Sequence, residues 1–229
     1  MLEYLFDFYK GKSKRIRIKS PEDINKKPKY ITEYELLTKL LELKERSINI
    51  WVVIIGLGHY HGTEPFKMGD TVHLVKEPGN YYDPYAIMAI CDGVGKCGYI
   101  ANSRSTVRDV TLSAEFLHGG VSDSCTAEVV DIDTEYILCR INGINYLDLI
   151  FNYGVNFYRE NKISNAMMFF EAIEDEYQTL EMFQRMSMCY LHFCNFIKAR
   201  EYADKALELD KNNLLTQRIL KEIQNKLNS

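Results

Sequence analysis

Three short segments decide the fold of this chain: GLGHYHG (56–62), GDTVHLVKEPGNYYDPYAI (69–87) and GKCGYI (95–100). The first overlaps INIWVVIIGL (48–57), a continuous β-branched and aromatic run that stops at glycines and is typical of a buried strand. Within the second, TVHLVKE (71–77) alternates apolar and polar residues, so one face of this strand is expected inside and the other in water. The three segments predict closely spaced strands and a polar, tyrosine-rich loop, in which we expect function to lie.

Further strands are predicted at similar spacing at AIMAICD (86–92), CGYIA (97–101), CTAEVVDID (125–133) and YILCRING (136–143). A helix-like segment, 103–117, interrupts them. Five or so short strands within about a hundred residues favour a small closed or nearly closed barrel over a parallel α/β sheet.

Residues 48–145 resemble the HIRAN domain, a family found in fork-remodelling helicase-like proteins. The resemblance rests on GHYHG (58–62), on a turn ending in Gly69 and Asp70, and on GYI (98–100) and AEVV (127–130). Its most specific part is a series of fixed spacing: Glu77, Pro78, Asn80, Tyr82, Asp83, Ala86 and Ile87.

The resemblance implies an OB-like barrel that captures the free 3′ end of single-stranded DNA, in DNA repair or replication-fork processing. An aromatic ring contributes roughly 1–3 kcal/mol per stacked base, whichever base it is. The resemblance also implies a role for each site residue. Tyr60 and Tyr82 would stack on bases, and His59 takes the place of a second stacking tyrosine. Asp83 would accept a hydrogen bond from the 3′ hydroxyl and Asn80 would contact a base edge or sugar, while Tyr99 and Asn102 would lie on the phosphate side.

Two positions depart from the family pattern, and both remove a cation. Gly58 stands where an arginine precedes the aromatic pair, and Asn102 stands where a phosphate-binding lysine is expected. Residues 48–145 hold 6 Lys and Arg against 12 Asp and Glu, a formal charge of −6. Because nucleic-acid affinity depends on neutralising phosphates, a barrel this acidic needs cations from elsewhere.

The N-terminal segment, 1–47, offers one source. It contains KSKRIRIK (12–19), whose Lys14, Arg15, Arg17 and Lys19 are candidate phosphate contacts. The alternative is a solvated edge whose charges discourage sheet-to-sheet pairing. TEYELLTKLLELKER (32–46) follows as a predicted amphipathic helix with Thr32 as its N-cap.

Residues 146–229 show helical periodicity and repeat themselves after 33 residues. Gly154, Phe157, Ala166, Phe170 and Ile173 correspond to Ser187, Tyr190, Ala199, Ala203 and Ala206. Small residues at a helix crossing and this period resemble tetratricopeptide (TPR) repeats. A further helix, 212–227, is expected to cap the stack. Such helices either bind a protein or peptide, or serve only to stabilise the protein or join it to a second copy.

Composition is that of a globular protein, with 46% hydrophobic residues. No apolar run approaches the ~20 residues of a membrane span, and MLEYLFDFY (1–9) lacks a cleavage site typical of a signal peptide. We therefore expect a cytoplasmic protein without membrane contact. The cysteines show no paired C-x-x-C spacing, which predicts free, buried thiols; they are Cys91, Cys97, Cys125, Cys139, Cys189 and Cys194.

Signs of enzyme chemistry are weak. GVGKCG (93–98) lacks the full phosphate-loop pattern and is expected in a hairpin turn. His59, His61 and His73 could gather a metal with Asp83, but an exposed histidine pair is more often polar surface. Cys189, His192 and Cys194 are placed on one helix as a core thiol with a satisfied histidine. No enzyme activity, metal or cofactor is expected.

The tyrosines of the loop have two interpretations. Tyr81, Tyr82 and Tyr85 could contact a ligand or could simply cover the barrel mouth with their hydroxyls in water. The sequence as a whole predicts an α+β protein: an OB-like, HIRAN-like barrel (48–145) followed by an all-α, TPR-like module (146–229). The hypothesis is a non-enzymatic adaptor that binds single-stranded DNA 3′ ends, or RNA ends, and a protein partner. The alternative is a protein-interaction scaffold without nucleic-acid binding.

Overall fold

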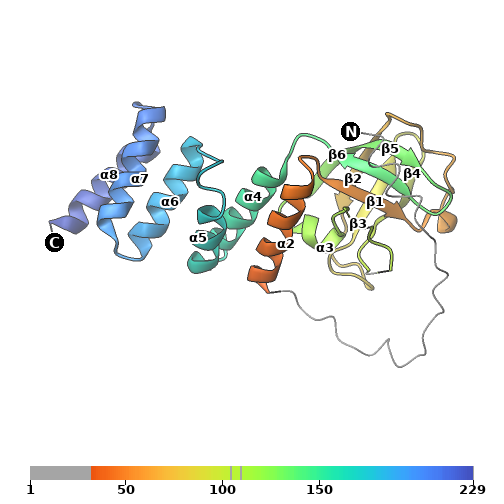
Figure 1. Cartoon of the computed structure of the whole chain (residues 1–229), viewed down its shortest axis with the longest axis horizontal. Coiled ribbons are helices and arrows are strands. Elements are labelled where there is room, and N and C mark those ends of the chain that lie inside the picture. The colour runs from red at the N-terminus through yellow and green to blue at the C-terminus, as the bar shows by residue number, and fades with distance from the viewer. Residues whose placement is uncertain (1–31, 104, 109, 229) are drawn as a thin grey trace, which may run out of the picture. The chain divides into compact units, whose positions relative to one another are not determined.

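Six antiparallel strands close into a barrel in the order β1-β4-β3-β2-β5-β6 (Figure 1). The computed structural model describes residues 32–228 except 104 and 109, so the basic residues Lys14, Arg15, Arg17 and Lys19 lie outside the described part. The predicted class, an α+β protein with a small barrel and a C-terminal helical module, is confirmed. The strand bounds are β1 Trp51–Ile55, β2 Thr71–Lys76, β3 Ile87–Cys91, β4 Gly95–Ile100, β5 Ser124–Ile132 and β6 Ile137–Ile141.

The barrel core follows from the residue patterns of its strands. Trp51 to Ile54 of β1 are all buried, as expected of a strand that pairs on both sides, with β4 and with β6. In β2, the alternation seen in the sequence places Val72 and Leu74 inside, where both are 1% exposed. In β2, apolar alternation therefore fixes which face of the strand turns inward.

The segment 103–117 is not the helix that the sequence predicted. Among the residues that the structure describes here, only Ala114–His118 (α3) is helical, with Ser113 as N-cap accepting a hydrogen bond from the Phe116 amide. Before it, the Leu112 amide donates to the Trp51 carbonyl at 2.7 Å, and Thr111 forms an isolated bridge with Trp51. A β-branched residue at this position favours extended backbone, and pairing with β1 stabilises it.

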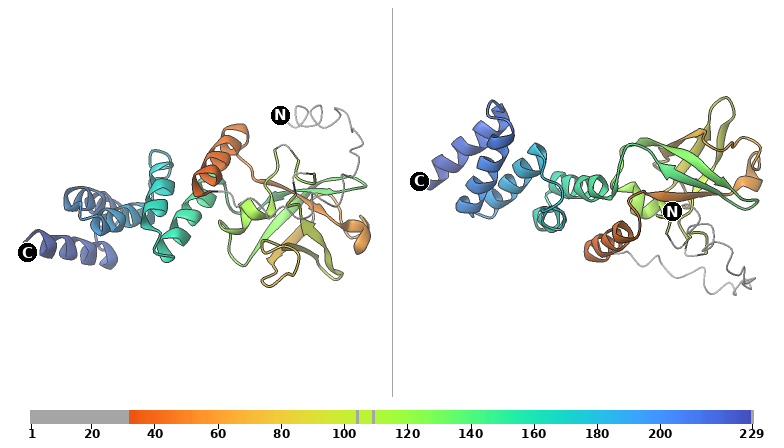
Figure 2. Two further views of the ribbon diagram at one scale, coloured as in Figure 1. Left: turned by 90° about the horizontal axis from the view of Figure 1, so that it is seen from below. Right: turned by 45° about the horizontal axis from the view of Figure 1, so that its top comes forward.

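The helical module consists of two helix pairs, α4–α5 and α6–α7, and a last helix, α8; Figure 2 shows their arrangement. Its bounds are α4 Tyr146–Arg159, α5 Ile163–Glu171, α6 Leu180–His192, α7 Phe196–Leu209 and α8 Leu214–Leu227. The repeat found in the sequence matches the pairs α4–α5 and α6–α7. At equivalent positions, Gly154 lies so close to Phe170 that a Cβ atom there would meet the ring at 2.4 Å, and the buried Ser187 donates to the Ala199 carbonyl. Small residues therefore allow the two helices of each pair to approach closely.

Helix α2 (Glu33–Arg46) precedes the barrel. It packs against α4, and Figure 1 shows the two helices side by side. Leu37, Leu40 and Leu43 form its buried face, which confirms the predicted amphipathic helix. Residues from Glu33 onward belong to one compact unit. In the described part of the chain, none of the helices is both long enough and apolar enough to cross a bilayer.

The cysteines are free thiols, but not all are buried. Burial raises the pKa of Cys139 to about 12 and that of Cys189 to about 12, so both are held as neutral thiols. The sequence predicted that Cys189, His192 and Cys194 lie on one helix. For Cys194 this prediction was wrong. Helix α6 ends at His192, and Cys194 lies exposed in the following turn with a φ of 57°.

Candidate nucleic-acid interface

The loop between β2 and β3 carries most of the predicted site. The Glu77 amide donates to the Ala86 carbonyl, which closes the base of the loop. Gly79 has a φ of 86°, a left-handed conformation that glycine adopts without strain. The side-chain oxygen of Asn80 accepts from the amides of Tyr82 and Asp83 at 3.0 and 3.1 Å. The loop therefore has a defined shape, set largely by its own polar groups.

Glu77 anchors this loop to β4. Its Oε2 accepts from the Tyr99 hydroxyl at 2.6 Å and from the Asn80 side-chain amide, and its Oε1 lies 3.1 Å from Lys96 Nζ. The hydrogen bond from Tyr99, with those from Asn80 and Lys96, lowers the pKa of Glu77 to about 2. Glu77 therefore stays charged and keeps three donors directed at it.

Asp83 anchors the other side of the loop. One oxygen accepts from the Tyr85 amide at 2.8 Å, and the other accepts from Asn102 Nδ2 at 2.9 Å. Asn102 in turn accepts from the Glu115 amide in the first turn of α3. Burial, with the nearby Asp83 carboxylate, raises the pKa of Glu115. Asp83 thus sits half-buried with a fixed orientation.

Two pairs of tyrosine rings, one in this loop and one formed with β4, differ in exposure. Tyr81 and Tyr82 are each 92% exposed, with their ring centroids 5.2 Å apart. Tyr60 is 36% exposed, and its ring centroid lies 6.4 Å from that of Tyr99. Large aromatic side chains this exposed on a shaped loop are available to stack on a ligand.

The predicted site residues fall into two groups in the structure. His59, Tyr60 and Tyr82 are exposed, whereas Asn80, Asp83, Tyr99 and Asn102 are engaged in hydrogen bonds that shape the loop. The assignment of all seven to nucleic-acid binding stays a prediction.

Sequence reasoning missed Lys96, and a β-bulge explains why. In a regular strand, residues 96 and 99 would face opposite sides. The register with β3 shifts between Ala89 and Ile90, so that Gly98 pairs with Ala89 and Lys96 with Ile90. The extra residue in β4 brings Lys96 to the same side as Tyr99, with its Nζ 4.3 Å from the ring centroid.

The Glu77 cluster predicts a specific pH dependence. Because its folded pKa of about 2 lies below the ordinary 4.5, Glu77 stabilises the fold fully above about pH 4.5, and this stabilisation is lost as the pH falls toward 2. Its side chain is 30% exposed, so we expect about 1 kcal/mol or less in the free energy of unfolding. The free energy of unfolding, measured in urea, should fall less between about pH 6 and about pH 3 in Tyr99→Phe than in wild type. Tyr136→Phe is the control; an equal change in both variants would contradict the assignment.

Possible metal ligands do not gather at this site. His73 Nε2 lies 3.1 Å from an Asp92 oxygen, while His59 and His61 are exposed. Among the residues that the structure describes, no group of three or more His, Cys, Asp or Glu side chains is arranged to hold a metal ion.

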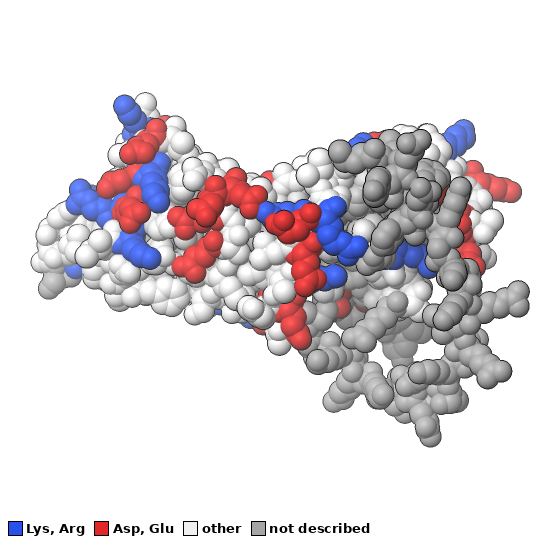
Figure 3. Space-filling view, in the orientation of Figure 1, with Lys and Arg blue, Asp and Glu red and all other residues white. Residues whose placement is uncertain are grey.

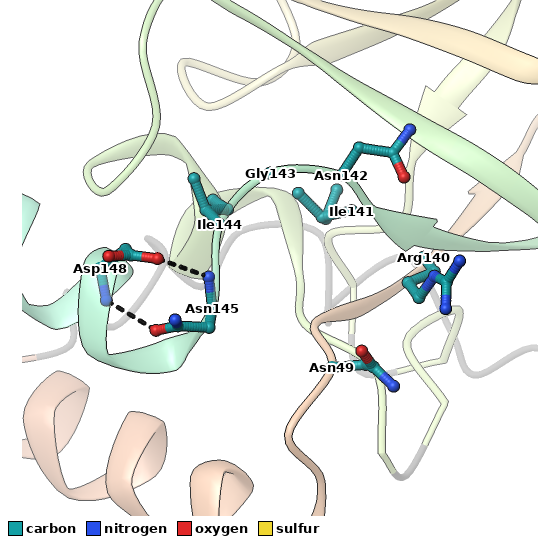
Figure 4. A pocket seen from close by; sticks show the side chains of 8 residues that line it. All are labelled: Asn49, Arg140, Ile141, Asn142, Gly143, Ile144, Asn145 and Asp148. Carbon is teal, nitrogen blue, oxygen red and sulfur yellow. Dashed lines mark hydrogen bonds between the residues drawn. The ribbon is translucent and has the colours of Figure 1, made fainter.

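Two hollows lie elsewhere on the described surface. The first, of about 380 Å³, lies where β6 leads into α4 and is lined by residues such as Asn49, Arg140 and Asn142 (Figure 4). Within its lining, Asn145 and Asp148 exchange hydrogen bonds as a capping box that satisfies the start of α4 (Figure 4). The second is a groove of about 460 Å³ among the helices, lined by Tyr158, Met188, Leu191, His192, Cys194, Phe196, Leu215, Arg218, Ile219, Glu222 and Lys226.

Charges over the helices are of both signs. Figure 3 shows acidic and basic side chains intermixed over α7, in keeping with the pairs Arg200–Asp204 and Lys205–Glu201. Exposed pairs of this kind contribute little to stability, typically about 0.3–0.5 kcal/mol each.

Neither protein-family models nor curated proteins match this chain. Among solved structures, the first TPR of Spaghetti (RPAP3), bound to the HSP90 peptide SRMEEVD, matches with a TM-score of 0.34 and 20% identity over 36% of this chain and 67% of that one. The HIRAN domain of human HLTF matches with a TM-score of 0.33 and 14% identity over 47% of this chain and 88% of that one. A protein from Lactobacillus plantarum matches with a TM-score of 0.31 and 21% identity over 41% of this chain and 91% of that one. Each of these similarities covers less than half of the chain.

Proposed function

We propose that the barrel binds the end of a single-stranded nucleic acid, most simply a DNA strand with a free 3′ hydroxyl, and that the protein is a non-enzymatic adaptor. The observation that carries the proposal is Asp83, a half-buried carboxylate held in place beside tyrosines that are 92% exposed. Exposed rings suit stacking on bases without sequence preference.

The chemistry of Asp83 favours an end over the interior of a strand. Each of its oxygens accepts one hydrogen bond within the protein, and a carboxylate oxygen has two lone pairs, so acceptor capacity remains. A hydroxyl can donate to it, whereas the phosphodiester inside a strand has no proton to give and is repelled. The expected ligand is therefore a terminus that carries a hydroxyl.

Asp83→Asn tests this proposal with oligonucleotides that end in a 3′ hydroxyl or a 3′ phosphate. A hydrogen bond to a charged group contributes about 1.5–3 kcal/mol, so we expect wild type to prefer the hydroxyl end about tenfold or more. In the variant, binding of the hydroxyl end should weaken while binding of the phosphate end should hold or strengthen. Fluorescence anisotropy at two salt concentrations measures both.

Asp131→Asn on β5 is the matched control, because it removes the same charge. Ser124 pairs with Val75 near the loop, whereas Asp131 lies toward the opposite end of β5. If both variants change binding alike, only the overall charge matters and the role given to Asp83 is wrong. If wild type binds no oligonucleotide even at low salt, the nucleic-acid proposal fails as a whole.

We also propose that the helical module binds a protein, as a peptide in its groove or as a second copy. The groove among α4, α6 and α8 supports this, because apolar side chains such as Met188, Leu191 and Leu215 line it with Arg218 and Lys226 beside them. A concave surface that combines apolar side chains with charged ones, here Arg218, Glu222 and Lys226, suits an amphipathic segment. A chain that failed to bind nucleic acid would retain this function alone, as an interaction scaffold.

A further inference from the structure

We infer that Lys96 supplies a phosphate contact for the strand bound at the barrel, replacing the cations missing at Gly58 and Asn102. The inference rests on the proposed function and names the group that neutralises the ligand's charge. Lys96 Nζ lies 4.3 Å from the ring centroid of Tyr99 and 5.9 Å from that of Tyr60. A basic group beside rings that can stack on bases is the combination found in single-strand binding sites.

Of the four other described cations of the barrel, Lys67, Lys76, Arg108 and Arg140, the last three are committed to other contacts. Lys76 Nζ donates to the Val121 carbonyl at 2.9 Å. Arg140 pairs with Glu128 at 2.6 Å, and Arg108 lies over the Tyr136 ring. Lys96 differs because it stands next to Tyr60, a predicted stacking residue, and Tyr99, which was predicted to lie on the phosphate side.

The pairing of Lys96 with Glu77 does not prevent this role. Glu77 Oε2 holds the hydrogen bonds from Tyr99 and Asn80, whereas Lys96 faces only Oε1. If Lys96 turns toward a phosphate, the carboxylate keeps two donors and the loop keeps its anchor. The Lys96 side chain is 29% exposed, so its ammonium can reach a ligand without unfolding β4.

Within the site, Asp83 and Lys96 are placed to bind different parts of the strand. Tyr60 is partly exposed, and a nucleotide stacked on its ring brings a phosphate within reach of the flexible Lys96 side chain. Asp83 would bind the terminal hydroxyl, and Lys96 would bind a backbone phosphate. Phosphate contacts position a strand and set its salt dependence but do not choose between ends.

Lys96→Gln tests the inference through the salt dependence of binding. For single strands, the slope of log K against log salt changes by about 0.7 for each phosphate contact. We expect the variant to bind a 3′-hydroxyl oligonucleotide several-fold more weakly at low salt, with the slope smaller by about 0.7. The preference for a hydroxyl over a phosphate end should be unchanged, and Lys96→Arg should keep both slope and affinity near those of wild type.

Arg140→Gln is the matched control, since it breaks an ion pair between two strands on another side of the barrel. Thermal unfolding checks that each variant is folded. An unchanged slope in Lys96→Gln, or an equal change in Arg140→Gln, overturns the inference. If either of these two results is obtained while wild type still prefers the 3′-hydroxyl end, the proposed function stands and only the role of Lys96 is wrong. Absence of wild-type binding overturns both.

Discussion

Phe170→Ala is expected to lower the free energy of unfolding by about 3–5 kcal/mol, because truncating a fully buried aromatic residue leaves a cavity. The Phe170 ring is 0% exposed and lies 5.6 Å from that of Phe151. It also fills the space over Gly154, where α4 and α5 cross. Urea unfolding followed by circular dichroism measures the loss, with a constant m-value as the check that the same transition is observed.

A second substitution tests the cause. In wild type, Gly154→Ala should destabilise, because the added Cβ meets the Phe170 ring at 2.4 Å. In the Phe170→Ala background the same change should stabilise, since the space is free and alanine gains about 1 kcal/mol in helix propensity over glycine. Phe193→Ala, at a residue that is 47% exposed, should change stability by about 0.5 kcal/mol or less. If Gly154→Ala has the same sign in both backgrounds, the close contact does not govern the crossing.

Tyr153→Ala is expected to lower the free energy of unfolding by about 3–5 kcal/mol, because it removes a buried ring that ties α4 to α3 and to Gly119 directly after it. The Tyr153 hydroxyl accepts from the Gly119 amide at 3.1 Å and donates to the Phe116 carbonyl at 3.0 Å. The ring lies 5.8 Å from that of Phe169. Burial raises the pKa of Tyr153, so the hydroxyl keeps its proton and can donate.

Tyr153→Phe separates the hydrogen bonds from the ring. The phenylalanine variant keeps the packing but leaves the Gly119 amide and the Phe116 carbonyl without this partner, at a cost of about 1–3 kcal/mol. Both variants are compared with wild type by urea unfolding. Equal losses in the two would show that packing contributes nothing, and a neutral Tyr153→Phe would show that the hydrogen bonds are replaced on mutation.

Local pattern predicted much of the fold. The alternation of TVHLVKE and the run INIWVVIIGL correspond to β2 and β1, and the spacing of Leu37, Leu40 and Leu43 gave the buried face of α2. Where the sequence failed, a tertiary partner decided. Residues 105–108 and 110–113 do not continue a helix, because the Leu112 amide donates to the Trp51 carbonyl of β1 and Thr111 forms a bridge with Trp51. No local pattern reveals these contacts.

Only part of the candidate site could be predicted from the sequence, because its polar groups have partners that lie far away in the chain. The composition of EPGNYYDPYAI marks a shaped, aromatic loop, and the exposed positions of Tyr60 and Tyr82 agree with that reading. The partners of its polar groups come from elsewhere in the chain. Asn102 reaches Asp83 from beyond β4, and Tyr99 reaches Glu77 across the sheet.

The sequence by itself determined which faces are apolar, where turns must occur and where small residues recur, because these depend on the chemistry and spacing of neighbouring residues. Only the tertiary structure decided the closure of the barrel and the placement of Lys96 beside Tyr60 and Tyr99. For Lys96, the physical reason is a single extra residue in β4, which shifts its register with β3. A bulge depends on how two strands pair, and pairing is settled by the free energy of the whole core.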